Sequence, residues 1–200
     1  MCGRYLLEAD YEALIERYGI LDDFNALYEK KEEIFPGQSI LAITHNGEFN
    51  ERRSFIWGLK FTPKRILINS RIETVLNSKL YDRFRPCIIP ASGYYEWENI
   101  HKRKMKITAD SKIINLAGLF DLHSNTVSII TTEATPEMEW IHNRMPLVIE
   151  ETEQDQWLKA VQLKKYLFHY DLKKTLKFSA ENLESSTQLS FFSEDFFEKI

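Results

Sequence analysis

The second residue of the chain, Cys2, has the most distinctive chemistry in the sequence. The chain begins Met-Cys-Gly-Arg-Tyr. Removal of Met1, which is usual before a small side chain, gives Cys2 a free α-amine beside its thiol. Because the pKa of such an amine is about 7.7–8.0 and that of a thiol about 8.5, both are partly nucleophilic near neutral pH. A 1,2-aminothiol condenses with an aldehyde to an imine and then closes to a thiazolidine. One hypothesis is that Cys2 traps or attacks a carbonyl carbon. The pentapeptide favours at least as well a small buried side chain near a strand start.

Three further polar residues stand where acid, base or amide chemistry could operate. Glu96 lies in an aromatic run, Gly-Tyr-Tyr-Glu-Trp over 93–97. A carboxylate there is either paired, at the sheet margin, or raised in pKa by desolvation, and the last case suits a general acid. The competing interpretation is a strand residue that faces water. His142 ends a short helical segment and Asn69 closes an apolar run, so each is either a chemical group or an ordinary cap or strand terminator.

Metal and cofactor chemistry is not indicated. The five histidines do not pair at metal-ligand spacing, and the two cysteines, Cys2 and Cys87, form no C-x-x-C motif. No glycine-rich phosphate loop and no nucleophile elbow is present. Cys87 precedes two isoleucines and is interpreted as an inert core thiol. We therefore predict no metal and no cofactor.

The overall composition predicts one cytoplasmic domain. The chain has 200 residues, of which 44% are hydrophobic, and a formal net charge of -4. This length fits a single domain over 1–200 with an ample core, and the acidic balance argues against a globally basic nucleic-acid binder. Two unpaired cysteines indicate a reducing compartment. The first twenty residues lack the apolar stretch of a signal peptide, and no stretch is long enough to span a membrane. We expect a monomer that does not bind membranes.

Hydrophobic periodicity predicts the elements that must position these groups. Apolar residues at helical spacing predict a helix over 11–18, with Gly19 at the position of a C-terminal cap. Asn46-Gly47 between two β-branched and apolar runs predicts a hairpin of 39–45 with 49–57. The period of two in 93–97 places Tyr94 and Glu96 on one face of a strand and the other two aromatic residues on the opposite face.

The remaining segments predict an α+β fold with a mostly antiparallel, curved or barrel-like sheet and flanking helices. Loops are expected over 20–34 and 58–64, and a helix over 73–83. A short strand over 87–89 should stop at Pro90. Further strands are expected over 2–7, 105–109, 113–120, 127–132 and 147–149. Residues 136–142 read as one or two helical turns, and Thr152-x-x-Asp155 resembles a capping box. The phenylalanine-rich tail, 191–197, is expected to dock on the body of the protein.

A local basic run could serve nucleic-acid binding despite the acidic total. Between 57 and 85 the acidic residues are few, and the cations are Lys60, Lys64, Arg65, Arg71, Lys79, Arg83 and Arg85. Lysine and arginine would contact phosphates, while Trp57 and Phe61 are available to stack on bases. A solvated basic face explains the same residues equally well, so both interpretations remain open.

Four sequence blocks together resemble one family. They read Met-Cys-Gly-Arg-Tyr (1–5), Ile-Asn-Ser-Arg-Ile-Glu-Thr (68–74), Cys-Ile-Ile-Pro-Ala-Ser-Gly-Tyr-Tyr-Glu-Trp (87–97) and Ile-His-Asn-Arg-Met-Pro (141–146). In this order they resemble the signature blocks of the SOS response-associated peptidase (SRAP) family. Its members form covalent crosslinks with abasic sites in single-stranded DNA. The resemblance covers about residues 1–150 of a single SRAP domain, and the C-terminal part, 151–200, matches only loosely.

The resemblance implies a role for each matching residue. Cys2 would form the thiazolidine crosslink after Met1 removal, Asn69 would fix the geometry of the amine and sugar, Glu96 would act as general acid and base, and His142 would assist at the sugar oxygen. The residues implied to contact DNA are Gly3, Arg4, Trp57, Ser70, Arg71 and Lys79. AP-lyase and autopeptidase activities are also implied, as is association with the nucleoid.

Two other functions remain open from the sequence, and some positions depart from the family pattern. One alternative is a thiol peptidase with Cys2 as nucleophile and His142 as base. The other is a non-covalent nucleic-acid-binding module in which Cys2 is structural. Ser70 replaces a common alanine. Family members often carry Asn shortly before the Pro-Gly turn, where this chain has Glu33 and Ile34.

Overall fold

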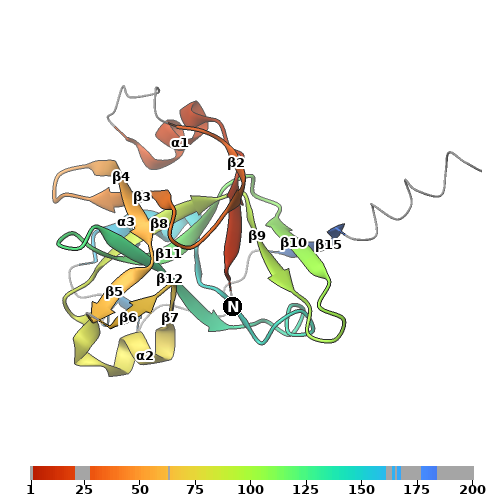
Figure 1. The fold of residues 1–200 in the computed structure, drawn as a ribbon. Helices are drawn as coiled ribbons and strands as arrows, with labels where there is room; N and C mark the ends of the chain where they lie inside the picture. The colour runs from red at the N-terminus through yellow and green to blue at the C-terminus, as the bar shows by residue number, and fades with distance from the viewer. Residues whose placement is uncertain are drawn as a thin grey trace, which may run out of the picture.

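The described part of the chain forms two larger curved sheets, which meet near the N-terminus, and a two-stranded sheet of β5 (Leu59–Thr62) and β6 (Arg65–Leu67) (Figure 1). A computed structural model describes residues 2–20, 28–62, 64–160, 164, 166–167 and 177–183. The strands are β1 (Arg4–Leu7), β2 (Lys31–Ile34), β3 (Ser39–His45), β4 (Asn50–Trp57), β5 (Leu59–Thr62), β6 (Arg65–Leu67), β7 (Asn69–Arg71), β8 (Arg85–Ala91), β9 (Gly93–Trp97), β10 (Lys104–Ala109), β11 (Ile114–Asp121), β12 (Thr126–Glu133), β13 (Arg144–Pro146), β14 (Val148–Ile149) and β15 (Phe178–Asn182).

The larger sheet closes on itself as a barrel. Its strand order is β13-β12-β4-β3-β8-β11-β14, and a further pairing of β11 with β12 completes a ring through β12, β4, β3, β8 and β11. Most neighbours are antiparallel, whereas β12 runs parallel to β4 and to β7. The predicted α+β class and barrel-like sheet are therefore confirmed. Closure buries the inner side chains of these strands, and it removes the exposed sheet edges that invite aggregation.

The smaller sheet carries the N-terminus. Its order is β15-β10-β9-β1-β2, with all pairs antiparallel. The first residue of β9, Gly93, has no room for a side chain. A Cβ atom there would lie 2.5 Å from the carbonyl oxygen of Ile107 on β10. Figure 1 shows β1 in the centre of the molecule, between the barrel and the strands β9 and β10. The N-terminal residues thus lie where the two sheets meet.

The helices whose bounds the described residues give are short. They are α1 (Tyr11–Tyr18), α2 (Ile72–Asn77) and α3 (Gln154–Leu158), with 3₁₀ turns at Lys79–Tyr81 and Glu151–Glu153. The predicted first helix and its cap are confirmed, since Gly19 adopts the left-handed conformation at φ 60°. The predicted helix over 73–83 is shorter and breaks at Ser78, whose side chain accepts a hydrogen bond from the backbone N–H of Leu80.

Several expected boundaries are wrong for identifiable reasons. The expected loop over 20–34 contains β2, whose polar sequence gives no strand signal but pairs with β1. The expected loop after Gly58 contains β5, which pairs with β6. Pro90 does not stop β8, because it lies within the strand opposite Asn115. Residues 136–142 form hydrogen-bonded turns, not a helix.

The hairpin of β3 and β4 is confirmed, but its connection is longer than a two-residue turn. Asn46 accepts hydrogen bonds on its side-chain oxygen from the backbone N–H groups of Glu48 and Phe49. The expected capping box is wrong, because α3 has no side-chain cap hydrogen bond. The expected docking of the tail over 191–197 lies outside the described residues.

Candidate active site where the two sheets meet

Cys2 and Asn69, distant in sequence, are joined by a hydrogen bond. The side-chain amide of Asn69 donates to the backbone carbonyl of Cys2 at 2.8 Å. Asn69 opens β7, which is fixed by parallel pairing opposite Ile129 of β12. The other amide atom, Oδ1, is buried and has no hydrogen-bond partner among the described residues. An open acceptor therefore lies on the side chain that holds the Cys2 backbone.

Glu96 lies close to Cys2 because β9 pairs with β1. Arg4 is opposite Tyr95 in this pairing. Glu96 is only 6% exposed, and its Oε1 atom accepts a hydrogen bond from the backbone N–H of Trp97 at 3.4 Å. Burial raises the pKa of Tyr94, and the nearby Cys2 and Glu96 raise it further. Tyr94 and Glu96 thus share the face that meets Cys2, as the period of two predicts.

The thiol of Cys2 is held in its neutral form. The side chain is completely buried, and its Sγ atom contacts the carbonyl oxygen of Arg4 at 3.7 Å. Burial, and after it the charge of Glu96, raises the pKa of the thiol from an ordinary value of 9.0 to about 12. A thiol peptidase needs a thiolate with a lowered pKa. The environment of Cys2 has the opposite effect, so it disfavours that alternative.

The raised pKa of Cys2 predicts slow alkylation. At a given pH below 9, the thiolate fraction of a thiol with a pKa of about 12 is about 10³ times smaller than that of an ordinary thiol. We expect iodoacetamide to label Cys2 in the folded protein at least that much more slowly than in the denatured chain. The rate should continue to rise through pH 10, where an ordinary thiol has levelled off. Mass spectrometry of the labelled peptide measures this labelling rate. A rate that stops rising near pH 9 would contradict a raised pKa for the Cys2 thiol.

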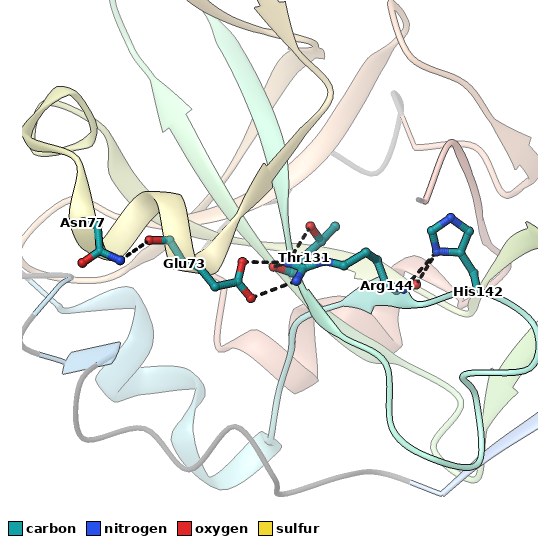
Figure 2. A network of polar contacts seen from close by, with 5 residues as sticks. All are labelled: Glu73, Asn77, Thr131, His142 and Arg144. Atoms are coloured by element: carbon teal, nitrogen blue, oxygen red, sulfur yellow. Dashed lines mark hydrogen bonds and ion pairs between the residues drawn. The ribbon is translucent and has the colours of Figure 1, made fainter.

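His142 is oriented by a network that links the start of β13 to β12 and α2 (Figure 2). Its Nδ1 atom accepts a hydrogen bond from the backbone N–H of Arg144 at 2.9 Å. The Arg144 guanidinium donates two hydrogen bonds to the Glu73 carboxylate, at 2.8 and 3.0 Å, and one to the carbonyl oxygen of Thr131 at 2.7 Å. Figure 2 shows Glu73 and Asn77 of α2 at one end of this network and His142 at the other.

Strand β12 explains why these segments meet. Thr131 is opposite Arg71 of β7 and also opposite Pro146 of β13. One residue of β12 therefore fixes both the strand that begins with Asn69 and the strand that follows His142. The bidentate pair of Arg144 and Glu73 then ties the two flanking segments together.

The pair of Arg144 and Glu73 was not among the predicted site residues, although both belong to the blocks quoted above. Arg144 is only 9% exposed. Partial burial acts to raise the pKa of Glu73, but the hydrogen bonds and charge of Arg144 outweigh it, so the pKa is lowered. The signal in the sequence was an arginine at the start of the apolar run 145–149, because a buried arginine requires a partner.

Two of the residues expected to contact DNA have buried side chains in this conformation. Trp57 is 0% exposed; its indole packs edge-on against Tyr5 and donates a hydrogen bond to the carbonyl oxygen of Ile68 at 2.8 Å. Ser70 is 1% exposed and its hydroxyl bonds to that of Ser128 at 2.8 Å. In this conformation the Trp57 ring therefore presents no exposed surface on which a base could stack. Both residues support the backbone around Asn69 instead.

The other expected DNA contacts remain accessible. Arg71 and Lys79 are exposed, and Gly3 and Arg4 are partly exposed. Among the described residues, no group of three or more His, Cys, Asp or Glu side chains is placed to hold a metal ion. No helix within the described part of the chain has the length and apolar character needed to cross a membrane.

Comparison with known proteins defines the class. The SOS response associated peptidase (SRAP) family matches residues 1–186, and this chain belongs to that family. The abasic site processing protein YoaM of Bacillus subtilis is 32% identical, with 79% of each chain covered. YobE of the same organism, which carries the same description, is 30% identical over 94% of this chain and 98% of its own. YedK of Escherichia coli, also so described, is 25% identical over 80% of each.

Solved structures confirm the fold. A protein from Bacteroides thetaiotaomicron superimposes with a TM-score of 0.72 at 23% identity, covering 90% of this chain and 91% of its own. A phage-related protein from Bordetella bronchiseptica gives a TM-score of 0.71 at 21% identity, covering 91% and 94%. The arrangement of sheets around the N-terminus is therefore the fold of this family.

Proposed function

We propose that this protein processes abasic sites in single-stranded DNA by forming a thiazolidine crosslink through Cys2 after removal of Met1. The observation that carries the proposal is the position of Cys2, buried beside the Glu96 carboxylate and hydrogen-bonded to Asn69. An acid and an amide beside a 1,2-aminothiol suit capture of an aldehyde. The relatives described as abasic site processing proteins support the same substrate class.

The chemistry needs three steps. The α-amine attacks the aldehyde carbon of the ring-opened sugar, and a carbon–nitrogen bond forms. The hydroxyl of this adduct then leaves as water, with a proton from Glu96, to give a protonated imine (iminium ion). In the last step the Cys2 sulfur adds to the iminium carbon, while the thiol proton passes to the Glu96 carboxylate and restores it. One aldehyde and one aminothiol thus give one thiazolidine and one water, with Glu96 acting first as acid and then as base.

The neutral thiol fits this order of events. A thiolate is not required for the first bond, because the amine makes it. The high pKa of the buried thiol keeps it from reacting with other electrophiles before the imine has formed. Asn69, with an open acceptor oxygen, would orient the amine or a sugar hydroxyl. His142, fixed through Arg144, would bind and protonate the sugar oxygen during ring opening.

DNA would be held mainly by its phosphates. Arg4, Arg71 and Lys79 would contact the phosphates that flank the lesion, with Gly3 allowing close approach of the strand. The crosslink shields the abasic site from strand cleavage, and the imine before closure could also undergo elimination, which is an AP-lyase reaction. The family description also names a peptidase, and release of Met1 by the protein itself would be such a step. The protein would act as a monomer in the cytoplasm, at the nucleoid.

A crosslinking assay tests the proposal. The protein is incubated with a single-stranded oligonucleotide that carries one abasic site, or with the intact oligonucleotide, and run on a denaturing gel after heating. We expect a slow band only with the abasic strand, and none with Cys2→Ala. Binding to DNA without such a band would favour the non-covalent module instead.

A further inference from the structure

A cluster of charges on the smaller sheet contains Arg4, one of the proposed phosphate contacts, together with Glu33 and Lys104. Glu33 of β2 bridges two cations with its two carboxylate oxygens. Oε2 accepts a hydrogen bond from the Arg4 guanidinium at 3.2 Å, and Oε1 accepts one from the Lys104 ammonium. Arg4 lies two residues from Cys2, and Lys104 comes from β10. One anion therefore joins cations from two separate strands.

Aromatic rings hold both cations in place independently of Glu33. The guanidinium of Arg4 lies over the ring of Phe35 at 4.7 Å and over that of Trp97 at 4.9 Å from the centroid. The ammonium of Lys104 lies 4.3 Å from the centroid of Tyr95. Cations supported in this way keep their positions when their anion is exchanged. The aromatic residues of β9 that face away from Cys2 thus form the floor of the cluster.

We propose that Arg4 and Lys104 form a two-cation site for a backbone phosphate of the DNA strand, and that the Glu33 carboxylate is an internal anion that competes for it. The proposal rests on the proposed function, because it takes single-stranded DNA as the ligand. A phosphodiester has two non-bridging oxygens, so it can bridge the two cations as the carboxylate does. The site adds Lys104 to the phosphate contacts, and it gives Glu33 a role in limiting affinity.

The exposure of the cluster allows this exchange. The side chains of Arg4, Glu33 and Lys104 are 34%, 29% and 21% exposed. Ion pairs this accessible to water contribute little to stability, so they exchange partners readily. Two cations and one anion leave a net single positive charge. Competition by Glu33 for the two cations therefore weakens non-covalent binding to any strand.

Glu33→Gln tests the competition, and Glu32→Gln is a matched control. Glu32 is the exposed neighbour on the same strand, and its substitution makes the same change in net charge. Affinity for an intact, fluorescently labelled single strand is measured by anisotropy at several salt concentrations. We expect Glu33→Gln to bind about tenfold more tightly than the parent, with the slope of log K against log salt steeper by about 0.7 for the one charge gained. Glu32→Gln should change the affinity and the salt slope much less.

Lys104→Gln separates a phosphate site from a general charge effect. In the Glu33→Gln background it should remove most of the gained affinity. In the parent chain, Lys104→Gln should weaken binding to the strand. If circular dichroism shows that Glu33→Gln does not fold, the Lys104→Gln variant of the parent chain alone tests the phosphate site. Equal effects of Glu33→Gln and Glu32→Gln, or no effect of Lys104→Gln, would overturn the proposal.

The crosslinking assay on the same variants keeps the two proposals apart. If the variants crosslink abasic DNA while Glu33→Gln gains no affinity, the phosphate site is wrong and the proposed function stands. If Glu33→Gln gains affinity for intact strands but no variant forms a crosslink, the phosphate site stands and the crosslinking function is wrong.

Discussion

Replacement of Cys2 by serine is expected to reduce the heat-stable crosslink to background. The α-amine remains in this variant, so the imine with the abasic aldehyde still forms. The ring cannot close efficiently, because a hydroxyl is a far weaker nucleophile than a thiol. The imine hydrolyses on heating unless it is first reduced. Cys2→Ser should therefore give almost no band on a heated denaturing gel, but a clear band when borohydride is added during the reaction.

Cys87→Ala provides the matched control for that result. Cys87 is the other thiol of the chain; it is also buried, and burial raises its pKa. Its removal should leave the heat-stable crosslink intact. Because the Cys2 side chain is small and a serine differs from it by one atom, Cys2→Ser should fold as the parent does. A heat-stable band of parental intensity from Cys2→Ser would contradict ring closure by sulfur.

Glu96→Gln is expected to slow crosslinking by about 100-fold without changing affinity for DNA, since a positioned general acid or base contributes about 10²–10⁴. Glutamine has nearly the same shape as glutamate and can retain the hydrogen bond from the backbone N–H of Trp97. It cannot donate the proton that expels water, nor accept the thiol proton. The rate with excess protein, taken from time courses on denaturing gels, measures the chemical step. Anisotropy with an intact strand measures binding.

The substitution also removes a charge that raises the pKa of Cys2. The pKa of the thiol should fall, yet crosslinking should still be slower, because the amine step and the loss of water come first. Glu48→Gln, at the exposed turn between β3 and β4, makes the same change in net charge far from the site and should leave the rate unchanged. Loss of binding in proportion to the rate in Glu96→Gln would contradict its role as acid and base.

Local patterns predicted the parts of the fold that local interactions determine. The period of two over 93–97 placed Glu96 on the face opposite the rings that support Arg4 and Lys104. The turn residues at 46 and 47 predicted the β3–β4 hairpin, and Gly19 predicted the end of α1. In each case the side chain or the backbone conformation of a few neighbouring residues is enough to determine the structure.

Long-range pairing determined the rest. The polar segment of β2 becomes a strand only because β1 offers it hydrogen-bond partners. Trp57 has the residue type of a base-stacking side chain, but closure of the barrel buries it, and its indole donates a hydrogen bond to the carbonyl oxygen of Ile68. The pairing of Arg144 with Glu73 depends on β12 placing β7 and β13 on its two edges. None of these facts follows from the spacing of residues along the chain.

The N-terminal residue provides the most direct test of crosslinking through an aminothiol. Two forms of the chain are prepared, one in which a protease has exposed Cys2 as the first residue and one that retains Met1 in an amide bond to Cys2. Both are incubated with the abasic oligonucleotide, and the heat-stable crosslink is quantified. We predict that only the form with a free Cys2 amine gives the crosslink, with mass spectrometry locating it on Cys2. An equal yield from the form that retains Met1 would contradict the mechanism.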